Sequence, residues 1–169
     1  MKKALSVLNQ LEKSRIIERY AIGGAMAATF YVEPFTTFDL DVFVIVPQTP
    51  SAMFFSLSSV YEALHAMGYS DEKECVLIEG IPVQFLPAYN PLLEEALAQA
   101  QDLLYEDVPT RVLLSEHLAA VAVQTGRAKD RMRVQMFLDA GVLDLAKLNG
   151  ILLKYGLEEK WKQWTGSFQ

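Results

Sequence analysis

The stretch that decides the fold runs from residue 37 to residue 46 and reads Thr-Phe-Asp-Leu-Asp-Val-Phe-Val-Ile-Val. Its β-branched and aromatic residues, closed by Pro47, predict the strongest strand in the chain. Side chains alternate along a strand, so we expect Asp39 and Asp41 side by side on one face. Two carboxylates this close repel each other, and a cation between them relieves the repulsion. The pair therefore indicates a site for Mg²⁺ or Mn²⁺, which prefer oxygen ligands, with two solvated acids at a wet strand end as the alternative.

Two glycines lie upstream of this strand. Residues 19–22 are short and largely apolar and predict a strand that stops at Gly23-Gly24, while residues 25–30 predict a helix. Glycine lets the backbone approach a phosphate closely, and the N–H groups at the start of a helix face an anion. Gly-Gly alone more often marks only a turn. The order strand, Gly-Gly, helix and Asp-X-Asp strand is much more specific.

The remaining pattern divides the chain into two parts. Apolar spacing predicts further helices, at residues 4–13, 51–67 and 91–100. Residues 74–78 and 81–86 predict a hairpin across Glu79-Gly80. From Ser115 onward the pattern is helical throughout, with helices expected at residues 115–124, 129–140, 144–155 and 157–164. We therefore expect an α/β (α+β) core in residues 1–110 and a helical region in residues 111–169.

Composition limits the class of protein. With 169 residues, 51% of them hydrophobic, the chain is about one domain long and has enough apolar side chains for a core. A net charge of −6 argues against a broad basic surface for duplex nucleic acid. The single cysteine, Cys75, is expected as a small buried residue and suits a reducing compartment. No signal peptide or apolar run of membrane-spanning length is apparent, so we expect a cytoplasmic protein without a membrane partner.

A resemblance to a known family follows from these residues. Ile22-Gly23-Gly24, followed after 14 intervening residues by Asp39-Leu40-Asp41, resembles the core motif of the nucleotidyltransferase superfamily. It is most similar to small bacterial proteins akin to the abortive-infection toxin nucleotidyltransferases. The similarity extends to Thr37, to the hairpin end at residues 83–87 and to the segment 126–131, Gly-Arg-Ala-Lys-Asp-Arg.

The resemblance implies a mixed sheet flanked by helices that binds a nucleoside triphosphate and two divalent ions. In such proteins the metals neutralise charge on the transferred and leaving phosphates. Asp39 and Asp41 would ligate Mg²⁺ or Mn²⁺. The residues assigned to the nucleotide or the incoming substrate are Gly23, Gly24, Thr37, Arg127 and Lys129. The expected reaction is transfer of a nucleoside monophosphate to an RNA, a protein or a small-molecule acceptor.

Three positions depart from the family pattern. The third catalytic acid of the family is expected at the position of Gln84, and a glutamine accepts hydrogen bonds but supplies no charge or base. Neither Glu74 nor Glu79, the nearest acids in sequence, is an obvious substitute. Phe35 stands where a basic residue is often found, and Arg133 stands where another acid is often found. A second hypothesis is therefore a catalytically impaired module that binds nucleotide or a protein partner, such as a toxin–antitoxin component.

A basic cluster opens one of the later helices. Arg127, Lys129, Arg131 and Arg133 place four positive charges within seven residues, in two pairs spaced four apart. The cluster is either a solvated helix face or a local patch that meets a triphosphate or an RNA end.

Overall fold

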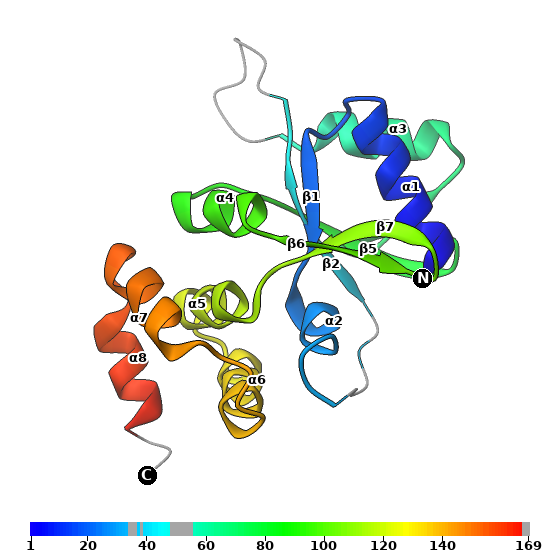
Figure 1. The fold of residues 1–169 in the computed structure, drawn as a ribbon. Helices are drawn as coiled ribbons and strands as arrows, with labels where there is room; N and C mark the ends of the chain where they lie inside the picture. The colour runs from blue at the N-terminus through cyan, green and yellow to red at the C-terminus, as the bar shows by residue number, and fades with distance from the viewer. Residues whose placement is uncertain (34–36, 38, 48–55, 167–169) are drawn as a thin grey trace.

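The computed structural model describes residues 1–33, 37, 39–47 and 56–166, and within them it contains one mixed sheet and eight helices (Figure 1). The strands are β1 (Arg19–Ile22), β2 (Leu40–Ile45), β3 (Ser70–Glu72), β4 (Cys75–Ile78), β5 (Ile81–Pro87), β6 (Gln101–Tyr105) and β7 (Val108–Val112). The helices are α1 (Lys2–Lys13), α2 (Gly24–Ala28), α3 (Ser58–Ala66), α4 (Pro91–Ala98), α5 (Ser115–Thr125), α6 (Ala128–Asp139), α7 (Leu145–Lys154) and α8 (Glu158–Thr165). The expected mixed sheet flanked by helices is confirmed.

The sheet places the predicted motif strand at its centre. In the described chain the strand order is β3-β4-β5-β2-β1-β7-β6. β2 runs antiparallel to β1 and parallel to β5, and β1 runs parallel to β7. The outer pairs β3–β4, β4–β5 and β6–β7 are antiparallel. Because β2 has a partner on each side, side chains from β1 and β5 border those of β2.

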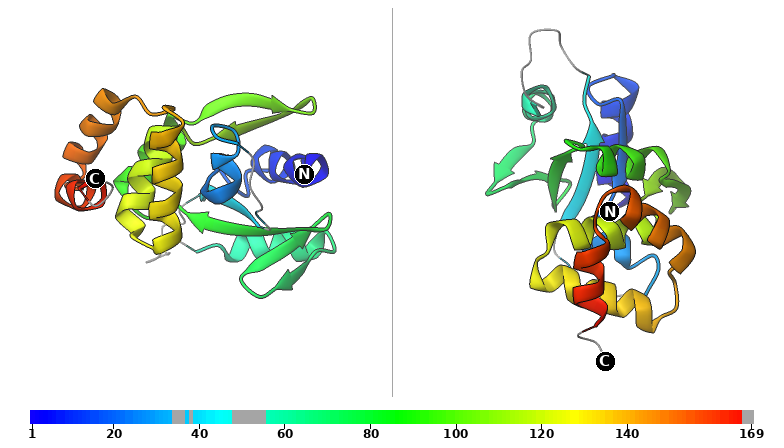
Figure 2. Two further views of the ribbon diagram at one scale, coloured as in Figure 1. Left: turned by 90° about the horizontal axis from the view of Figure 1, so that it is seen from below. Right: turned by 90° about the vertical axis from the view of Figure 1, so that its left-hand side faces the viewer.

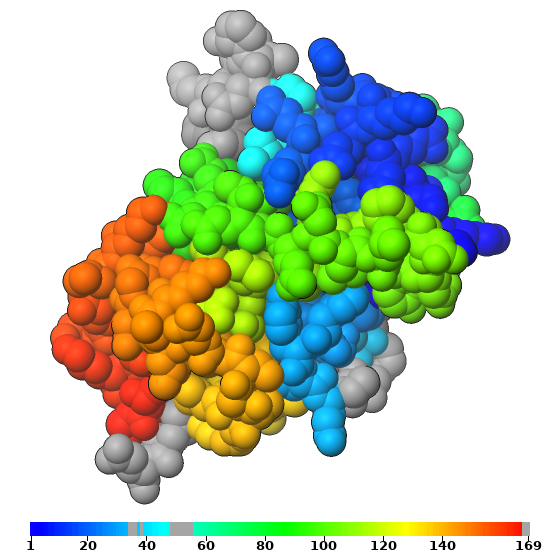
Figure 3. Space-filling view, in the orientation of Figure 1, coloured from blue at the N-terminus to red at the C-terminus, as the bar shows by residue number. Residues whose placement is uncertain are grey.

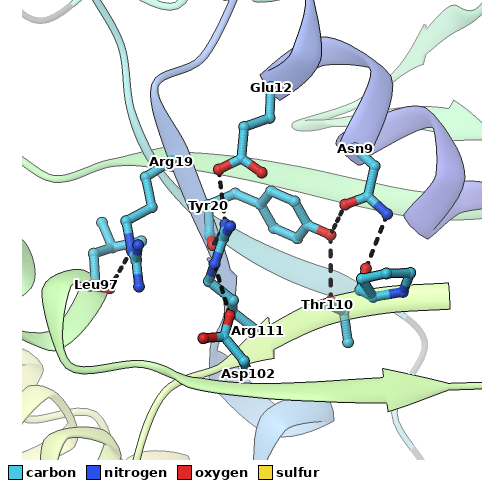
Figure 4. Close-up of polar contacts among 9 residues, drawn as sticks. Asn9, Glu12, Arg19, Tyr20, Leu97, Asp102, Thr110 and Arg111 are labelled. Carbon is cyan, nitrogen blue, oxygen red and sulfur yellow. Dashed lines mark hydrogen bonds and ion pairs between the residues drawn. The ribbon is translucent and has the colours of Figure 1, made fainter.

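Helices α1 and α4 cover opposite faces of the sheet. Consecutive residues of a strand point to opposite faces. On β1, Tyr20 donates a hydrogen bond to Asn9 of α1 at 2.7 Å, whereas the Nε of its neighbour Arg19 donates to the Leu97 carbonyl at the end of α4 at 2.8 Å. Figure 4 shows the two side chains leaving the strand in these different directions. Leu5, Leu8 and Leu11, at helical spacing within the helix expected at residues 4–13, give α1 the apolar face that it buries.

The hairpin β6–β7 was not predicted from the sequence. Its turn residues, Glu106 and Asp107, both have positive φ, 46° and 69°, which is the backbone of the tight hairpin turns that usually contain glycine or asparagine. Arg111 of β7 joins the hairpin to α1, because its guanidinium binds Glu12 at 2.7 Å and Asp102 at 3.1 Å (Figure 4). Tyr20 lies beneath this cation, with Arg111 Cζ 5.8 Å from the ring centroid. These contacts hold the hairpin against α1.

The helices after β7 form a lobe beside the sheet, at the opposite end of the molecule from α1 (Figures 1 and 2). The expected boundary at residues 110 and 111 falls within β7, and the helical region begins at Ser115. Helix α7 is bound to α4 through Glu95, which accepts hydrogen bonds from Lys154 and, at 2.5 Å, from Tyr155. These two donors lower the pKa of Glu95 to about 2. In the space-filling view the orange α7 lies directly against the green α4 (Figure 3).

A buried histidine lies under this junction. His117 of α5 is fully buried, with Nε2 3.5 Å from Glu95 Oε1, and neither ring nitrogen has a hydrogen-bond partner among the described residues. Burial lowers the pKa of His117, and the neighbouring Glu95 only partly opposes this. The ring is therefore held in its neutral form.

Two further differences concern the ends of elements. The helix expected at residues 51–67 begins at Ser58, and residues 51–55 lie outside the described residues. The short edge strand β3 was not predicted, because its Ser-Asp-Glu sequence is polar and exposed and has no apolar alternation. In the part of the chain that the structure describes, no helix is both long and apolar enough to cross a membrane.

Candidate active site

The candidate site lies on three neighbouring strands. Asp41 of β2 lies opposite Gln84 of β5, and continuation of the β4–β5 register places Cys75 opposite Gln84 on the other side. Paired residues on adjacent strands point to the same face. Asp41 shares its face with Ile45, whose partner on β1 is Arg19. The row Asp41, Gln84 and Cys75 therefore lies on the face that α4 covers.

The two predicted glycines contact the predicted acids in different ways. Gly24 has φ +59°, and a Cβ there would lie 1.7 Å from Asp41 Oδ2, so a side chain would collide with the carboxylate. Gly23 is buried below it, where a Cβ would lie 2.3 Å from the ring of Phe43. The Gly23 amide already donates to the Asp41 carbonyl at 2.9 Å. Gly24 thus borders the site directly. The absence of a side chain at Gly23 lets the backbone pack closely against the ring of Phe43.

Asp39 and Thr37 lie just before β2. Both are partly buried, and the Thr37 hydroxyl donates to Asp39 Oδ1 at 3.4 Å. Burial raises the pKa of Asp41 above its ordinary value, and the charge of Asp39 raises it further. Phe35 lies outside the described residues.

A cleft of about 230 Å³ opens over Asp41, between the sheet and the helical lobe. One side of it is mostly apolar and comes from the sheet, α4 and α5; the residues of that side are Phe43, Leu86, Pro87, Leu93, Leu118, Val121 and Ala122. Tyr89, with 63% of its surface exposed, also lines it. The polar end contains Gly24, Asp41 and Gln84 on one wall and charged side chains of the α6 segment on the other. The cleft therefore combines an apolar surface with a charged end.

The charged wall is organised by a buried carboxylate. Asp130 of α6 is 1% exposed and binds Arg127 through Nε at 2.7 Å and Nη2 at 3.2 Å. It also accepts a hydrogen bond from Arg133 Nη1 at 3.3 Å. All three line the cleft, whereas the predicted Lys129 is exposed and does not. Arg133, Lys129 and Arg127, in that order, oppose the rise in the pKa of Asp41.

This grouping was missed in the sequence although a signal for it was present. The segment Arg127–Arg133 places an acid midway between two arginines, at three-residue spacing on each side, which is the spacing of ion pairs along one helix face. The basic cluster is thus not a uniformly solvated face: Arg127 and Arg133 border the cleft, while Arg131 donates a hydrogen bond to the Trp164 carbonyl.

A second hollow adjoins the other side of Gln84. It measures about 340 Å³, and its lining residues are Asp39, Glu72, Lys73, Glu74, Cys75, Pro82 and Gln84. Gln84 Nε2 donates to Glu74 Oε2 at 3.4 Å, so the turn brings an acid beside Gln84, in this second hollow. The expectation that Cys75 is buried is wrong: it is only partly buried, because its side chain faces this hollow rather than the core.

The donor set decides whether these residues suit a divalent cation. Asp39 and Asp41 offer two carboxylates, and Gln84 offers an amide oxygen. Across residues 1–33, 37, 39–47 and 56–166, no group of three or more His, Cys, Asp or Glu side chains is arranged to hold a metal. Mg²⁺ is commonly bound through one or two carboxylates, with substrate phosphates and water completing its shell. The residues fit such an ion when a phosphate ligand is bound with it.

Comparison with known proteins places the fold. No protein-family model and no curated protein matches the sequence. The structure is similar to an antigenic nucleotidyltransferase-like protein from Paracoccidioides brasiliensis, with 12% identity, a TM-score of 0.55, and coverage of 96% of this chain and 89% of that one. It is also similar to the antibiotic-resistance factor ANT(2'')-Ia, with 12% identity, a TM-score of 0.52, and coverage of 100% of both chains. A complex of ANT(2'')-Ia with adenylyl-2''-tobramycin matches with 12% identity, a TM-score of 0.52, and coverage of 93% of this chain and 98% of that one. The chain therefore has the fold of nucleotidyltransferase-like proteins.

Proposed function

We propose that this protein is a nucleotidyltransferase that transfers a nucleoside monophosphate from a nucleoside triphosphate to a hydroxyl acceptor with Mg²⁺ or Mn²⁺. The observation that carries the proposal is the contact between the two motifs, in which Gly24 lies against the Asp41 carboxylate. A partly exposed glycine backbone that could approach a phosphate thus lies beside a carboxylate that could bind a metal. The solved structures of the same fold support this choice of reaction class.

The residues divide the work between phosphate and metal. Asp39 and Asp41 hold the cation, which when bound neutralises the charge that develops on the phosphates. In this proposal the phosphate-binding groups within the cleft are the Gly24 backbone and Arg127, and Thr37 and Lys129 contribute from outside the cleft lining, while Gly23 supports the turn from below. The acceptor oxygen bonds to the α-phosphorus, the bond between the α- and β-phosphates breaks, pyrophosphate leaves, and the hydroxyl proton passes to solvent.

The acceptor is an RNA end, a protein hydroxyl or a small molecule. In one similar structure, ANT(2'')-Ia holds an adenylylated tobramycin. The cleft of this chain has the apolar surface and the exposed Tyr89 that suit a flat ring, and it has two arginines where a polycationic sugar would need acids. These features favour an acceptor or nucleotide that carries negative charge.

The test is transfer of label. Purified protein is incubated with each α-labelled nucleoside triphosphate, Mg²⁺ and either total RNA, a protein lysate or a metabolite extract. We expect labelled product from wild-type protein and none from Asp39→Asn or Asp41→Asn. Transfer that persists in both variants, or that is absent with every triphosphate and acceptor pool, would contradict the proposal.

The neutral Gln84 supports a second candidate function. The protein would then be a catalytically impaired nucleotidyltransferase fold that binds nucleotide or a protein partner, as in a toxin–antitoxin pair. That function predicts nucleotide-dependent thermal stabilisation without product. Gln84→Asp separates the two, because appearance of transfer only in this variant would show that the missing charge had silenced the native protein.

A further inference from the structure

The two walls of the cleft carry opposite charges. The sheet wall contributes Asp41, next to the neutral amide of Gln84, while Asp39 lines the hollow on the other side of Gln84. The α6 wall contributes Arg127 and Arg133 with a single carboxylate, Asp130, between them. The sheet wall therefore has one negative charge, with that of Asp39 in the adjoining hollow, and the α6 wall has one net positive charge.

The geometry of the α6 wall fixes this positive charge in place. A carboxylate as buried as Asp130 is unfavourable unless it is paired, and here both partners are arginines. The side chain of Arg133 is itself only 12% exposed, so its guanidinium is confined at the cleft wall. Among the described residues, the guanidinium of Arg133 donates a hydrogen bond only through Nη1, to Asp130. Its other N–H groups can therefore donate to an anion.

Arg133 and Asp41 face the same cleft. Asp41 lies on its sheet wall and Arg133 on its α6 wall. A phosphate placed between the two walls would therefore meet a metal ligand on one side and a fixed guanidinium on the other. Guanidinium–phosphate contacts are among the stronger hydrogen-bonded pairs in proteins.

We propose that the site binds a single divalent cation, between Asp39 and Asp41, and that Arg133 provides the second positive charge against the triphosphate. The inference rests on the proposed function. One divalent ion balances the two carboxylates. A second ion would find only the neutral amide of Gln84 as a ligand where a carboxylate is expected. The guanidinium of Arg133 would also repel it.

Glu74 is the group that could overturn this assignment. Its carboxylate lies 3.4 Å from the Gln84 amide and lines the hollow that also contains Asp39. Its carboxylate accepts from that amide, and it is exposed on the turn between β3 and β4. An exposed carboxylate that already accepts a hydrogen bond attracts a second ion only weakly. The guanidinium of Arg133, 12% exposed and held by Asp130, repels such an ion from the cleft.

The experiment counts ions rather than turnover. Mn²⁺ is titrated into the protein with the α,β-methylene analogues of ATP, GTP, CTP and UTP in turn, and bound Mn²⁺ is measured by electron paramagnetic resonance. We expect one Mn²⁺ per chain with the analogue that binds. Two Mn²⁺ per chain in the wild-type protein would overturn the inference, and loss of one of them in Glu74→Gln would assign the second site to Glu74.

A variant pair tests the role of the guanidinium. Arg133→Gln is compared with Arg131→Gln, which removes the same charge from the same helix outside the cleft lining. We expect the analogue to bind roughly 10-fold or more weakly to Arg133→Gln and with unchanged affinity to Arg131→Gln, with one Mn²⁺ in both. The inference would be overturned if Arg133→Gln and Arg131→Gln both unfolded thermally like the wild-type protein and bound the analogue with equal affinity. Absence of any analogue binding to the wild-type protein is a different result, because it removes the proposed function as well.

Discussion

Replacement of Gly24 by alanine tests the contact on which the site depends. Gly24 has φ +59°, and an added Cβ would lie 1.7 Å from Asp41 Oδ2. Gly141 is a matched control, with φ +63° and no atom of the described chain within 4 Å of its added Cβ. Both substitutions place an L-residue in the left-handed region, so the backbone cost is common to both. Only Gly24→Ala adds a collision with another side chain.

The magnitude follows from these two contributions. A left-handed alanine costs about 1–2 kcal/mol at either position. At Gly24 the collision adds about 1–3 kcal/mol, the usual range for forcing extra atoms into a packed site. We therefore expect Gly24→Ala to lose about 2 kcal/mol more free energy of unfolding than Gly141→Ala. For a chain of this size, that difference corresponds to roughly 4–8 °C in Tm.

The assay is urea unfolding at pH 7, with nucleotide-analogue binding measured on the same samples. Gly24→Ala should also weaken binding, because the Asp41 carboxylate has to move, while Gly141→Ala should bind normally. In an Asp41→Ala background the extra loss at Gly24 should shrink, although Asp41 Cβ, 2.8 Å from the added atom, keeps part of the collision. Equal losses for the two glycine variants would refute the reasoning.

Three further predictions follow from other contacts. Asp41→Asn should reduce nucleotidyl transfer at least ~100-fold. It should nevertheless raise Tm at pH 7, because burial and the neighbouring acid disfavour the charge of Asp41. A fall in Tm would contradict this account. Burial lowers the pKa of His117 from 6.5, so its contribution to stability is complete above pH 6.5 and is lost as the pH falls below it, by up to about 1.4 kcal/mol per pH unit. Urea unfolding between pH 7 and pH 5 should show a smaller pH dependence in His117→Asn than in wild type, since Glu95, with a pKa of about 2, stays charged throughout. Tyr20→Phe should cost about 1 kcal/mol of unfolding free energy by removing the 2.7 Å hydrogen bond to Asn9, and an unchanged denaturation midpoint would show that the bond contributes nothing.

The sequence was most informative where the signals were local. The apolar run around β2 predicted the strand, because alternation along a strand needs no tertiary information. The strand begins at Leu40, so Asp41 lies within it and Asp39 just before it. The Gly-Gly turn was equally visible. What the sequence did not distinguish is that Gly23 packs against Phe43 while Gly24 borders the carboxylate, since both look alike until the β1–β2 register is known.

The features that were missed depend on contacts between distant segments or on unusual turns. The hairpin β6–β7 turns at Glu106 and Asp107, which both have positive φ although the turn contains no glycine or asparagine. Glu74 reaches Gln84 only because the β4–β5 register places the β3–β4 turn beside it. The partial exposure of Cys75 has the same origin. None of these follows from composition or periodicity, because each requires the strand order.

Gln84 and Arg133 show how tertiary placement changes the interpretation of two departures from a family pattern. Taken one at a time in the sequence, each suggests lost activity, since a neutral amide and a base stand where acids were expected. In the structure both line one cleft, and both make it more positive where a triphosphate would lie. Asp130, buried between Arg127 and Arg133, holds both guanidinium groups at the wall of that cleft. The two changes therefore fit one altered anion site better than two independent losses, and the number of bound ions is the property in which these explanations differ.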